Sequence, residues 1–258
     1  MTFRHFPLNQ KPEPARPRLG LLVPATDHIS EPAILDMVAG TGIDVMVNRV
    51  KLQNPITVAN LARMVDDVTR ASTDLLPDGR IDAVIFSCTS GTVAVGPERV
   101  GQAIAAGRPG VPFTTPITAG IKGCKLLGLK RIAVLTPYLD EVNEPIRRFI
   151  EQNGIAVGDF GSFKVSTEPE IAAIQPETIL AAAKALDAPG IDGIFISCTG
   201  MRGHRALDAL EQAIGKPCLS SNQAQLWDAL GLIGYDKPIK GFGSMLARTP
   251  VAARHAAE

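Results

Sequence analysis

The chain contains the nonapeptide Ile81-Asp82-Ala83-Val84-Ile85-Phe86-Ser87-Cys88-Thr89, and later in its sequence the similar Ile191-Asp192-Gly193-Ile194-Phe195-Ile196-Ser197-Cys198-Thr199. A second pair precedes these, because segment 18–24 (RLGLLVP) resembles segment 131–137 (RIAVLTP). A third pair follows, with Val111-Pro112 and Thr114-Thr115 matching Lys216-Pro217 and Ser220-Ser221. Segments doubled in the same order predict two similar halves rather than a solenoid, which needs three or more units.

Short apolar runs alternate with longer amphipathic stretches, which is typical of βαβ units around a parallel sheet. The predicted strands are 19–23, 44–49, 83–87, 111–114, 132–135, 155–158, 193–197 and a short one near Cys218. The predicted helices are 58–75, 97–106, 141–153, 176–186 and 204–214. The fold class is therefore α/β, with two pseudosymmetric domains, parallel sheets and a cleft between the domains.

The repeat also predicts the domain boundaries. Residues 1–17 form a flexible Pro-rich arm, since they contain Pro7, Pro12, Pro14 and Pro17 and no apolar core. Residues 18–117 together with 222–258 form the first α/β domain, and residues 118–221 form the second.

Composition excludes several classes of partner. The 258 residues carry 26 Lys and Arg against 26 Asp and Glu, so no net field attracts phosphate backbones or anionic lipids. We therefore expect neither a nucleic-acid nor a membrane partner, and no apolar run reaches the roughly 20 residues needed to span a bilayer. The 4 cysteines include no C-x-x-C pair, which favours reduced thiols in the cytoplasm.

Cys88 and Cys198 are the candidate catalytic residues. Each ends an apolar strand, at the edge of a parallel sheet where ligands bind, and amides at a following helix start would lower the thiol pKa towards neutrality. Two thiols facing each other across the cleft can move a proton, or add to carbon, from opposite sides without a cofactor. Cys124 and Cys218 are interpreted as packing residues.

Other chemistries have less support. A zinc site built from the two repeated thiols with His28 and His204 lacks the usual ligand spacing, so no metal is expected. No phosphate-binding glycine motif follows any strand, so no nucleotide cofactor is expected. A non-catalytic two-lobed protein that closes on a small acid remains an alternative, although it would have no use for two opposed thiols.

These residues together resemble the aspartate/glutamate racemase superfamily, in the branch of maleate cis-trans isomerase, arylmalonate decarboxylase and ectoine-utilisation protein A. The resemblance runs from about Leu19 to Leu246 and is carried by Val23-Pro24, segment 87–91 (SCTSG), segment 135–138 (LTPY) with Asn143, and segment 197–200 (SCTG). It implies Rossmann-like (flavodoxin-like) three-layer domains and an isomerase or racemase of a small carboxylate. We also expect a homo-oligomer.

The resemblance also assigns residues. Cys88 would be the nucleophile or base and Cys198 the opposing acid, and Tyr138 would bind a substrate carboxylate. The predicted substrate-binding set is Asp27, Thr89, Ser90, Gly91, Tyr138, Asn143, Thr199 and Gly200, with weaker claims for Thr115 and Ser221. Retention of Cys88 argues against the decarboxylase reaction, since that enzyme has glycine at the first cysteine position.

Two departures bear on the substrate. Asp27 stands where maleate isomerases have an asparagine, and a second family asparagine has no match in Ser166-Thr167-Glu168-Pro169. An acid at Asp27 would repel a second carboxylate and favour an amino group. This predicts an amino-acid-like substrate, as in ectoine or hydroxyectoine utilisation, with maleate as the alternative; Asp27 acting only as a helix cap is an equally open interpretation.

Overall fold

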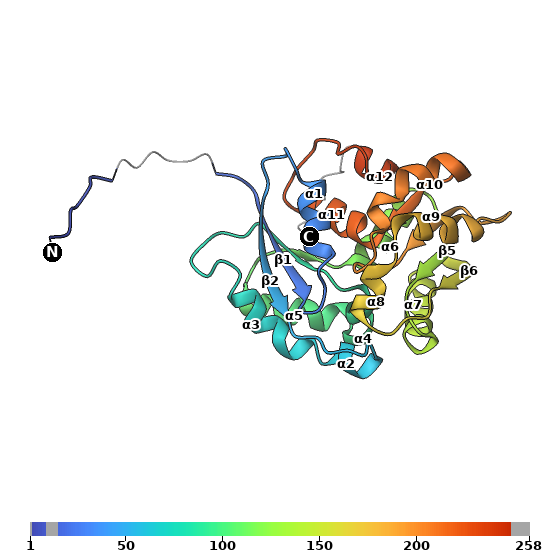
Figure 1. The fold of residues 1–258 in the computed structure, drawn as a ribbon, viewed down its shortest axis with the longest axis horizontal. Coiled ribbons are helices and arrows are strands. Elements are labelled where there is room, and N and C mark those ends of the chain that lie inside the picture. Colours follow the sequence, from blue (N-terminus) through green and yellow to red (C-terminus); the bar gives the residue numbers. More distant parts are fainter. Residues whose placement is uncertain (1, 9–14, 249–258) are drawn as a thin grey trace, which may run out of the picture.

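Two four-stranded parallel sheets form the framework of the computed structural model, which describes residues 2–8 and 15–248 (Figure 1). The first sheet has the order β2-β1-β3-β4 and the second the order β6-β5-β7-β8. The strands of the first are β1 (Arg18–Pro24), β2 (Asp44–Val50), β3 (Ala83–Phe86) and β4 (Phe113–Thr114). Those of the second are β5 (Arg131–Thr136), β6 (Ala156–Ser162), β7 (Gly193–Ile196) and β8 (Cys218–Ser220).

Helices cover the sheets, so the central strands are apolar on both faces; β3 and β7 are buried at every position. The helices are α1 (Ser30–Met37), α2 (Val58–Ala62), α3 (Val65–Thr73), α4 (Thr89–Val95), α5 (Pro97–Gly107), α6 (Pro116–Leu126), α7 (Asp140–Gln152), α8 (Glu168–Ala173), α9 (Pro176–Ala185), α10 (Leu207–Ile214), α11 (Ser221–Leu232) and α12 (Ser244–Ala247), with a 3-10 turn η1 (Gly203–Arg205). The predicted α/β class is confirmed.

Strand register confirms the sequence repeat. Leu19 pairs with Ala83 in the first sheet, and their counterparts in the repeat, Ile132 and Gly193, pair in the same way in the second. The repeated aspartate has the same role in both halves. Asp82 accepts a hydrogen bond from the amide of Arg18 (2.8 Å), and Asp192 accepts one from Arg131 (2.8 Å).

Several predicted boundaries were wrong. The single helix expected at 58–75 is divided into α2 and α3 at Arg63–Met64. The helix expected from 204 begins at Leu207, after the 3-10 turn. Strand β6 is longer than expected and its register shifts at Gly158, where an added Cβ would lie 2.5 Å from Ile191 Cδ1.

The third repeat is offset by one position from the predicted match. Val84 pairs with Phe113 and Ile194 pairs with Cys218, so Thr115 corresponds to Ser220 and not to Ser221. Thr115 caps α6 and Ser220 caps α11, each through its hydroxyl group. Helix-capping chemistry thus explains the small hydroxyl residues at both strand ends.

Helix α11 lies between the two halves (Figure 1). It packs against α6 and contacts strands of both sheets, namely β3, β4 and β8. The proposed division at 117 and 222 stays a prediction, and its outer parts at 9–14 and 249–258 lie outside the described residues.

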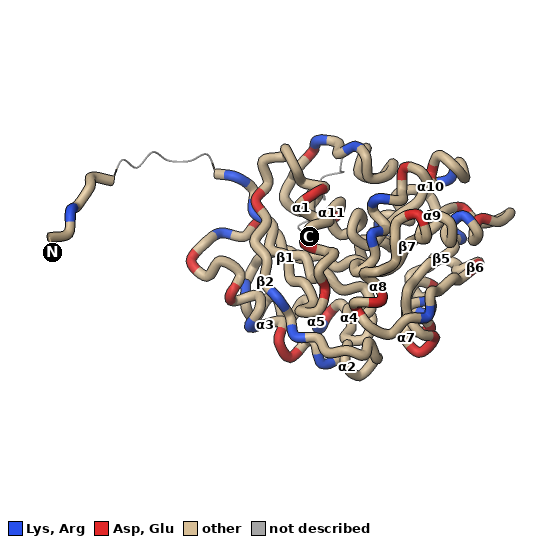
Figure 2. The backbone as a smooth tube through the Cα atoms, viewed as in Figure 1, with Lys and Arg blue, Asp and Glu red and all other residues tan. Residues whose placement is uncertain are grey.

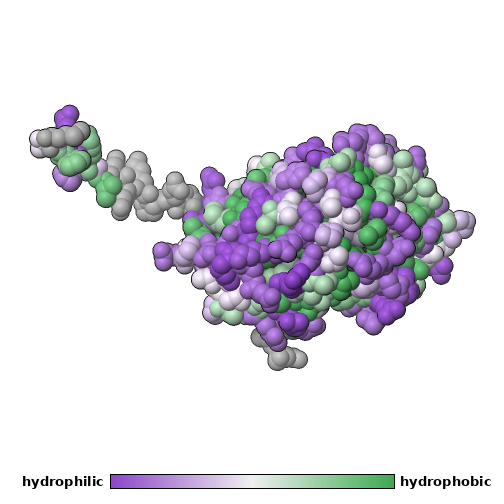
Figure 3. Space-filling view, turned by 60° about the horizontal axis from the view of Figure 1, so that its bottom comes forward, coloured by the Kyte–Doolittle hydropathy of each residue, from purple (hydrophilic) through white to green (hydrophobic). Residues whose placement is uncertain are grey.

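Acidic and basic residues are interspersed over the fold (Figure 2), in line with its zero formal charge. On the face shown in Figure 3, hydrophilic residues predominate and hydrophobic ones show in smaller groups between them. Within residues 2–8 and 15–248, no helix is long and apolar enough to cross a bilayer.

Candidate active site

The two repeated cysteines occupy equivalent positions, each just beyond the end of a central strand. Cys88 follows β3 and is the N-cap of α4, where its Sγ accepts a hydrogen bond from the amide of Gly91 (3.3 Å). Cys198 follows β7 but enters a turn and not the helix that was expected. The side chains are almost fully enclosed, with exposed fractions of 5% for Cys88 and 2% for Cys198.

Tyr138 is the polar partner of Cys198. Its hydroxyl group donates a hydrogen bond to Cys198 Sγ (3.0 Å). Ser90 of the first half interacts with both Tyr138 and Cys88, and it lowers the pKa of each. Tyr138 and Ser90 therefore connect the two thiols, and four residues predicted for the site do meet.

Asn143 supports Tyr138. Its Nδ2 donates to the Tyr138 carbonyl oxygen (2.8 Å), and its Oδ1 accepts from Thr136 Oγ1 (2.6 Å). Ser162 Oγ also donates to that carbonyl. In this structure, Asn143 holds the backbone that carries Tyr138, and direct contact between Asn143 and a substrate stays a prediction.

Helix α11 ties the two cysteine loops together, a feature that sequence reasoning missed. Ser221 and Thr89 share a hydrogen bond between their hydroxyl groups (2.9 Å). Asn222 Nδ2 donates to the Thr199 carbonyl (2.8 Å), and Gln225 Nε2 donates to Ser87 Oγ (2.9 Å). The sequence pattern that could have indicated this role is the run of polar residues in the first two turns of α11, a helix that is otherwise buried.

The loops also contact each other and leave little free space. Thr199 Oγ1 of the second half donates to the Ser87 carbonyl of the first (3.2 Å). An added Cβ at Gly91 would lie 2.7 Å from Cys88 Sγ, and one at Gly200 would lie 2.8 Å from Glu168 Oε2. The two predicted glycines thus border the thiol cluster directly.

Asp27 acts as a helix cap. Its Oδ1 accepts hydrogen bonds from the amides of Ile29 (2.7 Å) and Ser30 (2.9 Å), and its Oδ2 accepts one from the Ser30 hydroxyl group. Of the two interpretations, the structure supports capping of α1. Asp27 is nevertheless 2% exposed and its charge contributes to raising the pKa of both Cys88 and Cys198.

Glu168 is the acidic residue that sequence reasoning missed. It is the first residue of α8, is 7% exposed, and its charge contributes to raising the pKa of both site thiols. An acid in the first turn of a helix is ordinarily interpreted as a partner of the helix dipole. Only the packing of α8 against the cysteine loops reveals that Glu168 belongs to the site.

Burial governs the electrostatics of the cluster. Burial raises the pKa of the Cys88 thiol to about 12 and the pKa of Cys198 well above its usual range, in each case reinforced by the negative charge of Glu168. Burial also raises the pKa of Tyr138 well above its ordinary value. The expectation of lowered thiol pKa values was wrong, because desolvation outweighs the donated hydrogen bonds.

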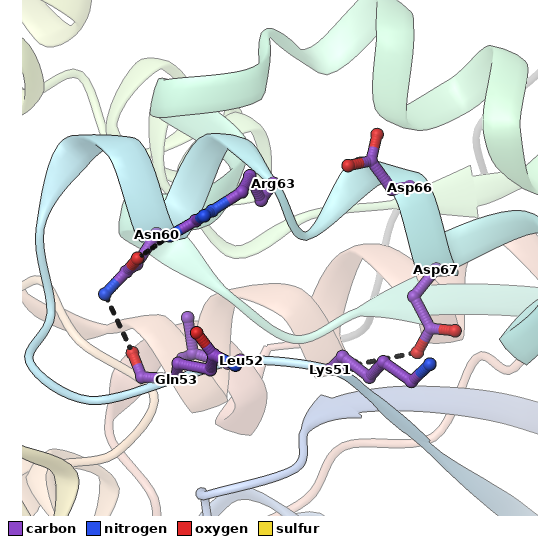
Figure 4. A pocket seen from close by; sticks show the side chains of 7 residues that line it. All are labelled: Lys51, Leu52, Gln53, Asn60, Arg63, Asp66 and Asp67. Atoms are coloured by element: carbon purple, nitrogen blue, oxygen red, sulfur yellow. Dashed lines mark hydrogen bonds between the residues drawn. The ribbon is translucent and has the colours of Figure 1, made fainter.

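The segments that contain Asn54 and Glu168 form a cover over the thiols, and they contact each other between the two halves. Asn54 Oδ1 accepts a hydrogen bond from the amide of Glu168 (3.1 Å), and the amide of Ile56 donates to the Ser166 carbonyl (2.7 Å). Beside this contact lies a cavity of about 260 Å³ in the first half, bordered by Lys51, Leu52, Gln53, Asn60, Arg63, Asp66 and Asp67 (Figure 4). That cavity shares no residue with the thiol cluster.

Neither His28 nor His204 forms a hydrogen bond with a thiol in the part of the chain that the structure describes. His28 is exposed, and His204 is buried in the 3-10 turn, where its ring stacks on Phe242 at a centroid distance of 6.2 Å. Among the described residues, no three or more His, Cys, Asp or Glu side chains form a cluster that could hold a metal ion.

The arrangement matches known proteins over nearly its whole length. The family model of arylmalonate decarboxylase matches residues 19–246. Arylmalonate decarboxylase of Bordetella bronchiseptica is 33% identical over 127 residues, which are 48% of this chain and 53% of that protein, so the alignment spans about half of that relative.

Solved structures extend the match. Maleate isomerase of Pseudomonas putida S16, solved with maleate as a cysteine-to-alanine variant, has a TM-score of 0.83 at 26% identity, covering 90% of this chain and 97% of that chain. A liganded arylmalonate decarboxylase carrying glycine-to-cysteine and cysteine-to-serine changes has a TM-score of 0.75 at 25% identity, covering 89% and 98%. The chain, with its two pseudosymmetric halves, belongs to the arylmalonate decarboxylase family.

Proposed function

We propose that the chain is a two-cysteine isomerase that acts on a small carboxylate and needs no cofactor. The observation that carries the proposal is the placement of Cys88 and Cys198 at equivalent strand ends, joined through Tyr138 in one buried cluster. The similarity to maleate isomerase supports an isomerase, and the presence of Cys88 favours chemistry that uses two thiols over decarboxylation.

For an acid with a proton on its α-carbon, the thiolate of one cysteine removes that proton and becomes a thiol. The electron pair left on carbon is delocalised into the carboxylate. The opposite thiol then donates its proton to the other face of the carbon and becomes a thiolate, so the centre is inverted with protons and charge balanced. Donors beside the reacting group, such as Tyr138, stabilise the negative charge during this transfer.

The same pair can isomerise a double bond, which is the second candidate reaction. One thiolate adds to an alkene carbon to form a C–S bond while the other thiol protonates the neighbouring carbon. Rotation about the resulting single bond, followed by the reverse steps, gives the trans product and restores the thiolate and the thiol. The match to maleate isomerase over 90% of the chain favours testing maleate directly.

An exchange experiment tests the proposal. The wild-type chain is incubated in D2O with amino acids, hydroxyectoine-derived diamino acids and maleate, and deuterium incorporation and isomer conversion are measured. We expect Cys88→Ser and Cys198→Ser each to lose turnover, whereas the matched variant Cys124→Ser, at a buried thiol outside the cluster, keeps it. Wild-type rates in either site variant would refute the proposal, and CO2 release from a disubstituted malonate would indicate decarboxylation instead.

A further inference from the structure

Glu168 has an unusual environment for a glutamate. Its side chain is 7% exposed, yet within the described residues no group donates a hydrogen bond to its carboxylate. No Lys, Arg or His of those residues forms an ion pair with it either; the neighbouring Glu170, by contrast, accepts hydrogen bonds from Thr167. Burying a carboxylate without a protein partner costs free energy, and a ligand that donates hydrogen bonds would offset that cost.

The carboxylate points towards the thiols. Glu168 Oε2 lies 2.8 Å from the place that a Cβ on Gly200 would occupy, and Cys198 Sγ lies 3.6 Å from the same place. Glu168 also interacts electrostatically with Cys88. The oxygen atom is therefore beside the position where a substrate held between the two thiols must lie.

Asp27 does not duplicate this role. Both of its oxygens accept hydrogen bonds from the first residues of α1, so its acceptor capacity is largely used. It adds negative charge without offering a free oxygen. The titratable groups that interact with Glu168 are Asp27 and the two thiols, none of which is a cation at neutral pH.

We propose that Glu168 binds a positively charged amino group of the substrate and thereby selects amino acids over acids that carry only carboxylates. The inference rests on the proposed function and names its substrate class. Ammonium groups supply three donors and a full positive charge, which suits a buried, partnerless carboxylate. A second substrate carboxylate at this position would instead offer no donor to Glu168 and would meet the negative charge of Asp27.

Amino-group binding also changes the protonation of Glu168. Burial, followed by the charge of Asp27, raises the pKa of Glu168 to about 8, so in the empty site at pH 7 its carboxyl group is mostly protonated. A bound ammonium group stabilises the ionised form, and one proton leaves to solvent.

The variant Glu168→Gln tests the inference, with Glu170→Gln on the same helix as the matched control. Glu170 is exposed, and glutamine keeps its acceptor for Thr167. The amino acid that the wild-type chain exchanges fastest in D2O is the probe. We expect Glu168→Gln to raise its KM at least tenfold, whereas Glu170→Gln leaves KM within twofold of wild type. Calorimetry at pH 7 in two buffers of different ionisation enthalpy should show proton release on binding, which Glu168→Gln abolishes.

The outcomes separate this inference from the proposed function. Thiol-dependent turnover of maleate with no exchange of any amino acid would overturn the role of Glu168 and leave the two-cysteine isomerase intact. Exchange of an amino acid with an unchanged KM in Glu168→Gln would also overturn it. Turnover that survives Cys88→Ser would overturn the proposed function itself.

Discussion

The contact between Gly91 and Cys88 offers a sensitive test of how the first thiol is held. Gly91 lies in the first turn of α4, and its amide donates the hydrogen bond that Cys88 Sγ accepts. In Gly91→Ala the new Cβ would lie 2.7 Å from Cys88 Sγ and 2.9 Å from Met64 Sδ. Both distances are below normal contact, and Met64 is fully buried, so the thiol must move.

The expected magnitudes follow from the crowding. Overpacking a buried site costs about 1–3 kcal/mol, and replacing glycine by alanine within a helix returns roughly 0.5–1 kcal/mol. The net loss of about 1 kcal/mol corresponds to a fall in Tm of roughly 2–4 °C for a chain of this size. Displacement of the reacting sulfur by about 1 Å costs on the order of 10²-fold in rate.

Gly101→Ala is the matched control, because its Cβ would lie 2.5 Å from the ring of Phe113, away from the thiols. Thermal unfolding and kcat for deuterium exchange are measured for both variants. We expect similar losses of Tm, with a fall in kcat of about 10²-fold confined to Gly91→Ala. A Gly91→Ala variant that keeps at least half of the wild-type kcat would refute the packing argument and the placement of Cys88 in the reaction.

Three further predictions concern hydrogen bonds. The hydrogen bond that Tyr138 donates to Cys198 Sγ (3.0 Å) lowers the pKa of that thiol. Tyr138→Phe removes this donor, so the limb of the kcat/KM profile that reports Cys198 should move to higher pH. A profile that does not move would contradict this. Asn54→Ala removes an acceptor from the cover over the thiols and should speed their alkylation by iodoacetamide about 3–10-fold; an unchanged rate would show that the cover does not limit access. Arg70 holds the pKa of Asp67 below its usual value, so the stability that Asp67 provides is complete above about pH 4 and is lost as pH falls through the lowered pKa. The difference in unfolding free energy between wild type and Asp67→Asn should therefore shrink in acid. A difference that stays constant with pH would refute the contribution of this ion pair.

The sequence predicted the framework because the repeat reports backbone geometry directly. Each repeated apolar strand pairs with the corresponding strand of its own half, so segments that match in the sequence form equivalent strand pairs in the two sheets. Repetition also identified Cys88 and Cys198, since a residue kept at equivalent strand ends occupies equivalent space. Helix ends and the division between α2 and α3 depend on local packing and were less predictable.

The rest of the site escaped prediction because it is asymmetric. Glu168 and Gln225 have no marked counterpart in the repeat, and each reaches the cluster from a helix whose direction the sequence does not specify. The pKa of each thiol was predicted in the wrong direction because position at a strand end does not reveal burial. Depth of burial depends on how the two halves close on each other.

That asymmetry gives the two thiols different chemistry. For Cys198 the charge of Glu168 is the largest influence after burial, whereas for Cys88 the hydrogen bond from Gly91 has a larger influence than that charge. The charge of Glu168 is thus the main opposition to ionisation that Cys198 meets after burial. Cys198 also has the hydroxyl group of Tyr138 as a donor, whereas Cys88 has the amide of Gly91, so the two thiols depend on different partners for their ionisation.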